Sequence, residues 1–116
     1  CNNDSMAMGA VQACINNGYN NGDAEKFVPI VGIDANIDAS EAMKAGSLLG
    51  TVLNDRLNQS DAIINVIKAV KEGKEITEEV VGVECTVEGK YVWVPYVIVD
   101  SSNLDETLEL MNSISE

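Results

Sequence analysis

Three polar side chains stand where short apolar runs end in the first half of the chain. Asp34 follows Val31-Gly32-Ile33, Asn54 follows Val52-Leu53, and Asn3 lies near the start of the chain. In an α/β sheet, ligands bind at the carboxyl ends of the strands. Asn3, Asp34 and Asn54 are therefore candidates for one polar binding site.

The chemistry of these side chains suits a neutral ligand that carries hydroxyl groups. An Asn amide offers one acceptor oxygen and two donor hydrogens, whereas an ionised Asp offers acceptor oxygens only. Together they match groups that both donate and accept, as sugar hydroxyls do. A phosphate would need Lys, Arg or a glycine-rich amide nest, which these strand ends do not supply. Each residue alone fits a turn or a helix cap equally well, so the prediction rests on the series of three.

The composition is that of a globular domain with a strong acidic balance. Hydrophobic residues make up 46% and charged residues 22% of the 116 residues, which is ordinary for one folded domain. Seven Lys plus Arg against nineteen Asp plus Glu give a net charge of -12, which disfavours nucleic acid as a partner. There is no His, so the commonest general base and transition-metal ligand is missing and no metal site is predicted.

The three cysteines, Cys1, Cys14 and Cys85, lie far apart and in no metal-binding or redox spacing. Their odd number prevents complete internal pairing, and we expect buried free thiols. A mature lipoprotein begins with a lipid-modified Cys, but the helical pattern that follows Cys1 at once favours the end of a strand instead. No targeting segment is visible from which to infer localisation.

The first half of the chain predicts helices alternating with strands. The first helix runs from Asp4 to Gly18, is capped by Asp4 or Ser5, and has an apolar face that includes Met6, Ala10, Ala13 and Cys14. Strands are expected at 28–33 and 48–53, with a short helix from Asp38 or Ser40 to about Gly46 between them. The packing side of this helix is expected to be Ala39, Ala42 and Met43. Such an order with short links predicts right-handed crossovers and a parallel sheet.

The second half opens with the most regular helical pattern, over 57–71, which is expected to end at Gly73. The pattern is less regular afterwards. The apolar stripe of that helix consists of Leu57, Ile63, Ile64, Ile67 and Val70. The segment 80–88 fits an edge strand or an extended loop, and Pro95 divides the apolar segment 91–99. A final helix capped by Ser101 and Ser102 is expected through Leu104, Leu108 and Met111.

Several stretches resemble the periplasmic sugar-binding proteins, and specifically the galactose/glucose-binding proteins of bacterial ABC importers. They occur in the family's order and spacing and cover nearly the whole chain. The stretches are Asn2-Asn3-Asp4-Ser5-Met6-Ala7-Met8-Gly9-Ala10, Pro29-Ile30-Val31-Gly32-Ile33-Asp34-Ala35, Gly50-Thr51-Val52-Leu53-Asn54-Asp55, Gln59, and Val94-Pro95-Tyr96-Val97. The first stretch is shared with ribose-binding proteins and lactose-repressor-like regulators, whereas its combination with the last two long stretches is more specific.

The resemblance implies an α/β fold with αβα layers around a parallel sheet, the type I periplasmic-binding-protein fold, present here only as its carboxyl-terminal part. Residues 1–54 and 96–116 would belong to one lobe and residues 55–95 to the other. In the family, the positions of Asn3, Asp34 and Asn54 hydrogen-bond a monosaccharide. Asp55 and the segment Val94-Pro95-Tyr96 would form hinge crossings between the lobes.

The resemblance also implies partners and a location for the parent protein. The ligand would be a galactose- or glucose-type sugar, the partners would be the membrane subunits of an ABC transporter, and the location would be extracytoplasmic, periplasmic or lipid-anchored. No cofactor is expected, because the family's calcium loop lies outside this chain. The family's stacking aromatics are also outside it, and Trp93 is assigned to packing or a surface. We therefore expect the isolated chain to bind sugar weakly or not at all. Because of its open sheet edge and apolar faces, we expect it to be stable only through self-association, strand exchange or a partner fragment.

Two other functions remain as alternatives. The effector-binding domain of a lactose-repressor-like regulator would have the same fold, and a helix-turn-helix segment upstream would distinguish it. An enzyme would need a pair such as Asp34 with Asp55 acting as acid and base, as in glycosidases. No arrangement of nucleophile and base is visible in the sequence, so we expect a protein without catalytic activity.

Overall fold

The chain folds into two compact units, which are described separately. The structure, a computed structural model, describes residues 1–113, with side chains up to Glu109 in the last helix. Unit 1 comprises Cys1–Asn54 and the residues from Val97 onward, and unit 2 comprises Asp55–Tyr96. The mixed α/β class predicted from the sequence is confirmed.

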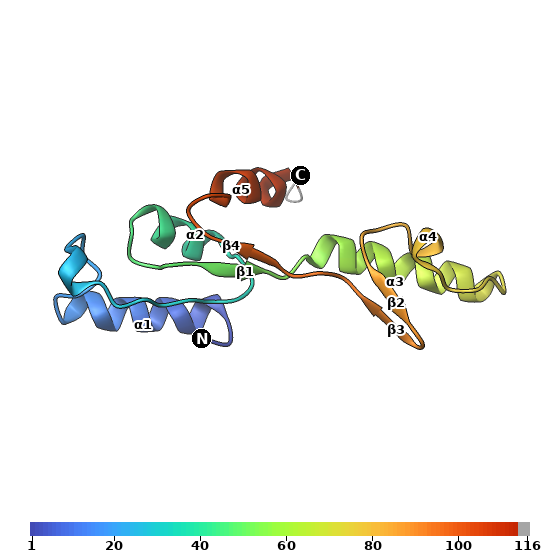
Figure 1. The fold of residues 1–116 in the computed structure, drawn as a ribbon, viewed down its shortest axis with the longest axis horizontal. Coiled ribbons are helices and arrows are strands. Elements are labelled where there is room, and N and C mark those ends of the chain that lie inside the picture. The colour runs from blue at the N-terminus through green and yellow to red at the C-terminus, as the bar shows by residue number, and fades with distance from the viewer. Residues whose placement is uncertain (114–116) are drawn as a thin grey trace. The chain divides into compact units, whose positions relative to one another are not determined.

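Unit 1 contains three α-helices around a pair of short strands (Figure 1). Their bounds are α1 Asp4–Asn16, α2 Ile37–Lys44, β1 Thr51–Leu53, β4 Val97–Val99 and α5 Leu104–Ser113, with the 3-10 helix η1 at Ala24–Lys26. Every helix predicted in this part of the sequence is present, and the side chain of Met111 lies outside the described residues.

The strands of unit 1 differ from a regular parallel sheet in two respects. The segment 28–33 forms no named strand and pairs in parallel only at the bridge between Val31 and Gly50. β4 pairs with β1 antiparallel, with Thr51 opposite Val99 and Leu53 opposite Val97. Parallel pairing is thus confirmed for the first connection. The sequence predicted no direction for the last strand, which is antiparallel because the chain enters β4 from unit 2 and not through a crossover helix.

The core of unit 1 lies between its helices and one face of these strands. It is built from small and aliphatic side chains: Ala7, Val11, Ile30, Ala35, Ala39, Ala42, Met43, Leu48, Leu53, Val99 and Leu104. The predicted packing side of α2 is confirmed, since Ala39, Ala42 and Met43 are buried. In α1, Ala7 and Val11 are buried; of the predicted face, Ala10 and Cys14 are partly buried against this core, whereas Met6 is exposed. The alanines let the helices approach the strands closely, which favours these positions over the bulkier Met6.

The cap of α1 is Asn3 and not Asp4 or Ser5 as predicted. The Asn3 side chain accepts a hydrogen bond of 2.9 Å from the backbone N–H of Met6. Asp4 is instead buried, with 1% of its surface exposed. Sequence spacing alone allows either assignment, and the burial of Asp4 decides it.

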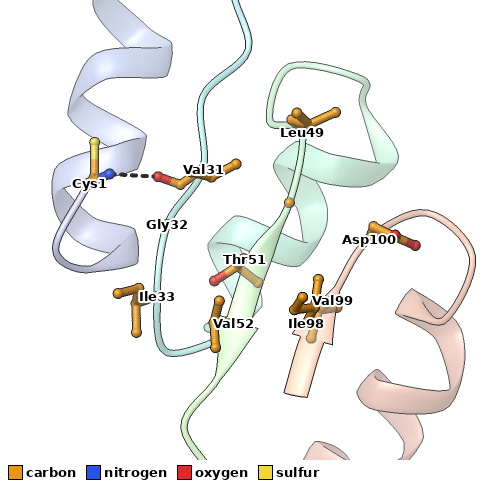
Figure 2. Close-up of a pocket in the computed structure, with 11 residues that line it drawn as sticks. Cys1, Val31, Gly32, Ile33, Leu49, Thr51, Val52, Ile98, Val99 and Asp100 are labelled. Atoms are coloured by element: carbon orange, nitrogen blue, oxygen red, sulfur yellow. Dashed lines mark hydrogen bonds between the residues drawn. The ribbon is translucent and has the colours of Figure 1, made fainter. Parts of the chain in front are cut away.

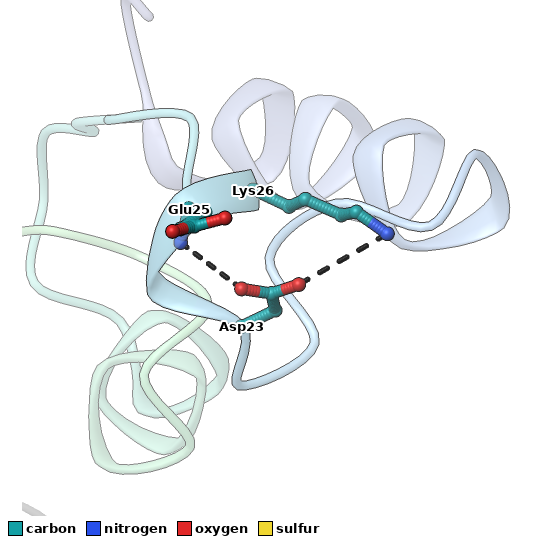
Figure 3. Close-up of polar contacts among 3 residues, drawn as sticks. All are labelled: Asp23, Glu25 and Lys26. Atoms are coloured by element: carbon teal, nitrogen blue, oxygen red, sulfur yellow. Dashed lines mark hydrogen bonds and ion pairs between the residues drawn. The ribbon is translucent and has the colours of Figure 1, made fainter.

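The loop between α1 and the first extended segment is ordered by two polar side chains. Asp23 caps η1 by accepting 3.0 Å from the N–H of Glu25, and it lies 4.0 Å from the Lys26 ammonium (Figure 3). Asn20 is buried, and its side chain bonds both the N–H and the carbonyl of Val28 at 2.7 and 2.8 Å. These bonds fix where the extended segment begins.

Unit 2 consists of two helices and a hairpin. The long helix α3 spans Arg56–Lys71, α4 spans Glu78–Val81, and the antiparallel strands are β2 Thr86–Glu88 and β3 Tyr91–Trp93. The segment 80–88 therefore combines the end of a helix with a strand, where the sequence predicted an edge strand or an extended loop. Asn65 on α3 donates 2.9 Å to the carbonyl of Val81 and so links α3 to α4.

The predicted apolar stripe of α3 is not buried within unit 2. Only Ala62 and Ala69 of this helix are buried, whereas Ile67 is 62% exposed. Leu57, Ile63, Ile64 and Val70 are exposed as well. The periodicity thus predicts the helix correctly, but the surface against which it would pack is not in unit 2.

The thiols are free, as predicted, but they are not buried. Cys1 is exposed, and Cys14 and Cys85 are half-exposed. Partial burial, followed in size by the nearby Glu78 carboxylate, raises the pKa of the Cys85 thiol. Free Cys is usually among the most buried residue types, but these three positions lie at the edges of small cores and are less buried than predicted.

Candidate functional site

The candidate site lies at one end of the extended segments of unit 1, where backbone hydrogen bonds bring three parts of the chain together. The N–H of Asp4 donates 2.8 Å to the carbonyl of Ile33, at the start of α1. The N–H of Asp34 donates 2.8 Å to the carbonyl of Val52, next to the end of β1. Asn3, Asp34 and Asn54 each lie within two residues of these bonds, so the backbone hydrogen bonds bring the chain near the three predicted residues to one end of unit 1. Their contact with a ligand stays a prediction.

Asn3 has two roles available at this end. Its side-chain oxygen caps α1 through the N–H of Met6, which leaves the amide NH2 group to donate to a ligand. The side chain is half-exposed. The helix N-terminus also contributes a partial positive charge that favours an electron-rich ligand atom nearby.

Asp34 is the acceptor group of the candidate site. It is half-buried, and within residues 1–113 its carboxylate receives no hydrogen bond from the protein. Its φ of 113° and that of Ala35, 54°, lie in the region that favours glycine. Such backbone conformations cost free energy and are concentrated at functional sites. The strained turn directs the chain from the extended segment into α2 with Asp34 at its apex.

Asn54 ends β1 and is half-buried. It is the last residue of unit 1 before the chain enters unit 2. An amide there would supply both a donor and an acceptor to a ligand at the strand ends.

The predicted hinge residues lie at the boundaries of the two units. Asp55 begins unit 2, and Tyr96 ends it. Asp55 caps α3, accepting 3.0 Å from the N–H of Asn58 and 2.7 Å from its side-chain amide. Val94 is half-buried, and Pro95 is exposed. A hinge motion at these residues stays a prediction.

The residue that sequence reasoning missed is Asp4. Its two carboxylate oxygens accept 2.6 Å from the Thr51 hydroxyl and 2.7 Å from the N–H of Asn36. Gly32 faces it so closely that an added Cβ would collide with Asp4 Oδ1. No local pattern in the sequence signals this arrangement, because Gly32 and Thr51 come from parts of the chain distant from Asp4.

Beside the strand ends, an open groove of about 540 Å³ runs along the face of the unit 1 strands that does not pack against the core. Figure 2 shows the extended segment at Val31 lying next to β1, and β4 beyond it, with Leu49 and Ile98 among the groove's side chains. The Cys1 ammonium donates 2.8 Å to the carbonyl of Val31 (Figure 2). The lining of this groove is mainly apolar, and its polar residues are Cys1, Thr51 and Asp100. The pKa of Asp100 is lowered by the Ser102 hydroxyl and then by the Ser102 N–H. Its lining does not match the polar chemistry of a sugar.

The aromatic residues of unit 2 form a separate surface. Tyr91 and Trp93 stack with ring centroids 5.5 Å apart, and Trp93 is 54% exposed. Trp93 thus lies at a surface, one of the two places predicted for it. Among the described residues there is no group of three or more His, Cys, Asp or Glu side chains that could hold a metal ion. Helices long and apolar enough to cross a bilayer are likewise not found in that part of the chain.

Comparison with known proteins gives a family match over residues 1–75, to the periplasmic binding protein domain. The chain is 38% identical over 108 residues to the D-galactose/methyl-galactoside binding periplasmic protein of Haemophilus influenzae. It is 32% identical over 111 residues to a xylitol-binding protein of Mycolicibacterium smegmatis. A candidate rhizopine-binding protein of Rhizobium meliloti is 31% identical over 105 residues.

These alignments cover most of this chain but a minor part of each relative. The covered share of this chain is 93%, 93% and 90% for the three proteins, in the order given. The corresponding share of the relatives is 30%, 30% and 29%. The chain therefore spans about a third of the length of the relatives it matches.

Proposed function

This chain belongs to the periplasmic binding protein domain family, and we propose that it forms part of a binding protein for a monosaccharide of the galactose or glucose type. The observation that carries the proposal is the meeting of Asn3, Asp34 and Asn54 at one end of unit 1. Two amides and one carboxylate there offer the donors and acceptors that sugar hydroxyls require. The relatives support it, since they are named for binding galactose, xylitol and rhizopine.

The protein acts by binding and not by catalysis. Asp55 receives two hydrogen bonds from Asn58 and so serves as a helix cap, which argues against its use as a general acid or base. The relatives are named as binding proteins, which supports the same conclusion. The parent protein works outside the cytoplasm and delivers its sugar to the membrane subunits of an ABC importer.

The two units correspond to parts of two lobes that close around the sugar. Unit 1 contributes Asn3 and Asp34, and Asn54 lies where the chain leaves unit 1. Asp55 and the segment Val94-Pro95-Tyr96 then act as hinges. Closure is driven by contacts that the ligand makes only in the closed form. Because part of those contacts comes from elsewhere in the parent protein, this chain alone binds the sugar weakly.

Nuclear magnetic resonance on the isotope-labelled chain tests this proposal. Galactose and glucose are titrated separately, and we expect saturable shifts of the Asn3, Asp34 and Asn54 resonances. Asp34→Ala removes the acceptor and should abolish these shifts, whereas Asp38→Ala removes an exposed carboxylate of α2 and should leave them intact. The proposal fails if either sugar shifts only resonances outside the strand ends, or if Asp34→Ala has no more effect than Asp38→Ala.

A further inference from the structure

Asp4 is the one buried carboxylate in the described part of unit 1, and the proposed sugar contacts do not use it. It is 1% exposed and sits in the first turn of α1. A carboxylate that is removed from water destabilises a fold unless its oxygens are hydrogen-bonded. The arrangement around Asp4 therefore needs an explanation.

Asp4 makes three hydrogen bonds, to residues on both sides of the Asp34 turn and to β1. Its N–H donates 2.8 Å to the carbonyl of Ile33. One carboxylate oxygen accepts 2.7 Å from the N–H of Asn36, and the other accepts 2.6 Å from the Thr51 hydroxyl. Thr51 in turn accepts 3.3 Å from the N–H of Ala35. These bonds enclose the strained turn at Asp34 from both sides.

The same bonds locate the proposed ligand groups. Asn3 precedes Asp4 directly, Asp34 lies between Ile33 and Asn36, and Thr51 begins the strand that ends at Asn54. Hydrogen bonds that hold Asp4 in place therefore also hold the backbone near Asn3, Asp34 and Asn54. Gly32 leaves the space that the carboxylate occupies, because a Cβ there would collide with Asp4 Oδ1.

We propose that Asp4 is a positioning residue for sugar binding, whose buried carboxylate holds Asn3, the Asp34 turn and the strand that leads to Asn54 in the geometry that the ligand requires. The inference rests on the proposed function of that site. Asp4 itself touches no ligand. Binding sites need supporting residues that lock their contact groups, since small displacements of those groups cost large factors in affinity.

A matched pair of substitutions at Thr51 tests the proposal. Thr51→Val keeps the shape but removes the hydroxyl donor, whereas Thr51→Ser keeps the donor. Asp4→Asn replaces one acceptor oxygen by a donor group. Val11→Ala serves as a stability control, because it creates a cavity in the same core without touching these hydrogen bonds.

In the sugar-free chain we expect Thr51→Val and Asp4→Asn to shift the amide resonances of Asn3, Asp34 and Asn36. The Asn36 amide should exchange with solvent at least about tenfold faster in Asp4→Asn than in Val11→Ala, because a bond to a charged acceptor is lost. Thr51→Ser should resemble the wild type. If Thr51→Val and Val11→Ala alter these resonances equally, Asp4 is only part of the core and the proposal is wrong. If Asp4→Asn does not fold, the comparison of Thr51→Val with Thr51→Ser still decides.

Adding galactose separates this proposal from the proposed function. We expect the sugar-induced shift at Asp34 to be lost in Thr51→Val and retained in Val11→Ala. Retention of that shift in Thr51→Val would overturn the positioning role while leaving the sugar site in place. Absence of any sugar-induced shift in the wild type would overturn the proposed function, and the sugar-free resonances would still decide whether Asp4 holds the strand ends.

Discussion

The helices of the two units have a similar apolar content but differ in how much of their apolar surface is buried. In unit 1, α1 and α2 bury Ala7, Val11, Ala39 and Ala42 against the strands. In unit 2, α3 buries only Ala62 and Ala69 and leaves its largest apolar side chains exposed. Unit 1 therefore has its own core, whereas unit 2 presents a helix with an open face.

The difference indicates which unit can hold polar ligand-binding groups in a fixed geometry. Unit 1 combines a packed core with buried polar ties such as Asp4 and Asn20, and rigid surroundings hold polar groups in place. Unit 2 has a solvent-exposed apolar stripe, and exposed apolar patches of this kind mark surfaces that bind other protein. We accordingly assign the ligand contacts to unit 1 and expect association through unit 2.

The largest expected effect is the difference in lost stability between a buried leucine of unit 1 and an exposed leucine of unit 2. Leu48→Ala in unit 1, where Leu48 is 3% exposed, should lower the free energy of unfolding by about 2–5 kcal/mol. Leu57→Ala in unit 2, where Leu57 is 40% exposed, should cost less than about 1 kcal/mol. Urea denaturation followed by resonances from each unit measures both. Equal losses would show that unit 2 buries its helix as unit 1 does.

The next effect concerns association through α3. We expect the chain to self-associate, and the triple variant Ile63→Lys, Ile67→Lys and Val70→Lys should shift its sedimentation toward the monomer, because it removes exposed apolar surface. A control with the same added charge, Gln12→Lys, Ala13→Lys and Asn16→Lys on the exposed face of α1, should leave self-association in place. A wild-type chain that is monomeric at high concentration would contradict the expectation.

Substitution of two glycines tests how tightly unit 1 is packed around each of them. Gly9 lies in α1 with open space around its Cβ position, so Gly9→Ala should stabilise the chain by about 0.5–1 kcal/mol. Gly32→Ala should destabilise it, because the added Cβ collides with the Asp4 carboxylate and lies 3.2 Å from the Ala7 Cβ. Thermal unfolding compares the two variants. A neutral Gly32→Ala would mean that the strand ends are less tightly packed than described.

The smallest effect is a pH dependence at the surface. The Ser102 hydroxyl, and then its N–H, lower the pKa of Asp100 in unit 1. In unit 2 the Lys74 ammonium lowers the pKa of Glu72 through a bond of 2.7 Å. Because both folded-state pKa values are depressed, their small contributions to stability are present above the unfolded pKa values. They are lost as the pH falls through the folded values.

Carboxyl NMR titrations distinguish the two surface carboxylates. Ser102→Ala should raise the pKa of Asp100 toward its ordinary value, whereas Ser101→Ala should not change it. Salt near 1 M shortens the screening length to about 3 Å, so it should raise the pKa of Glu72 more than that of Asp100. Identical responses to salt would contradict the different causes assigned to them.

The elements of this fold were predictable from local patterns. Gly18 and Gly73 end helices where the sequence places their ends, and the periodicity of α3 predicts its bounds closely. The pattern did not reveal what covers that helix, because periodicity reports a face and not its partner. It also left the direction of β4 undetermined, since strand direction depends on the route of the chain through unit 2.

The position of the candidate residues at one end of unit 1 was predictable, whereas the buried residues that support them were not, and their contact with a ligand stays a prediction. Asn3, Asp34 and Asn54 could be named because strand ends can be read from apolar runs. Asp4 was predicted as a helix cap, because an acidic residue at a helix start fits that role from the sequence alone. Its burial depends on Gly32 and Thr51, which reach it only after the chain has folded. Long-range contacts of this kind have no local signature.

The most direct test of the central claim is the dissociation constant of galactose for the monomeric chain, measured by NMR titration with Asp34→Ala and Asp38→Ala beside the wild type. We predict weak binding, with a dissociation constant far above the micromolar range. We also predict resonance shifts at Asn3, Asp34 and Asn54 that are abolished in Asp34→Ala and retained in Asp38→Ala. Micromolar binding by a monomer would contradict the assignment of a partial site to unit 1. Sugar-induced shifts that survive in Asp34→Ala would contradict the site itself.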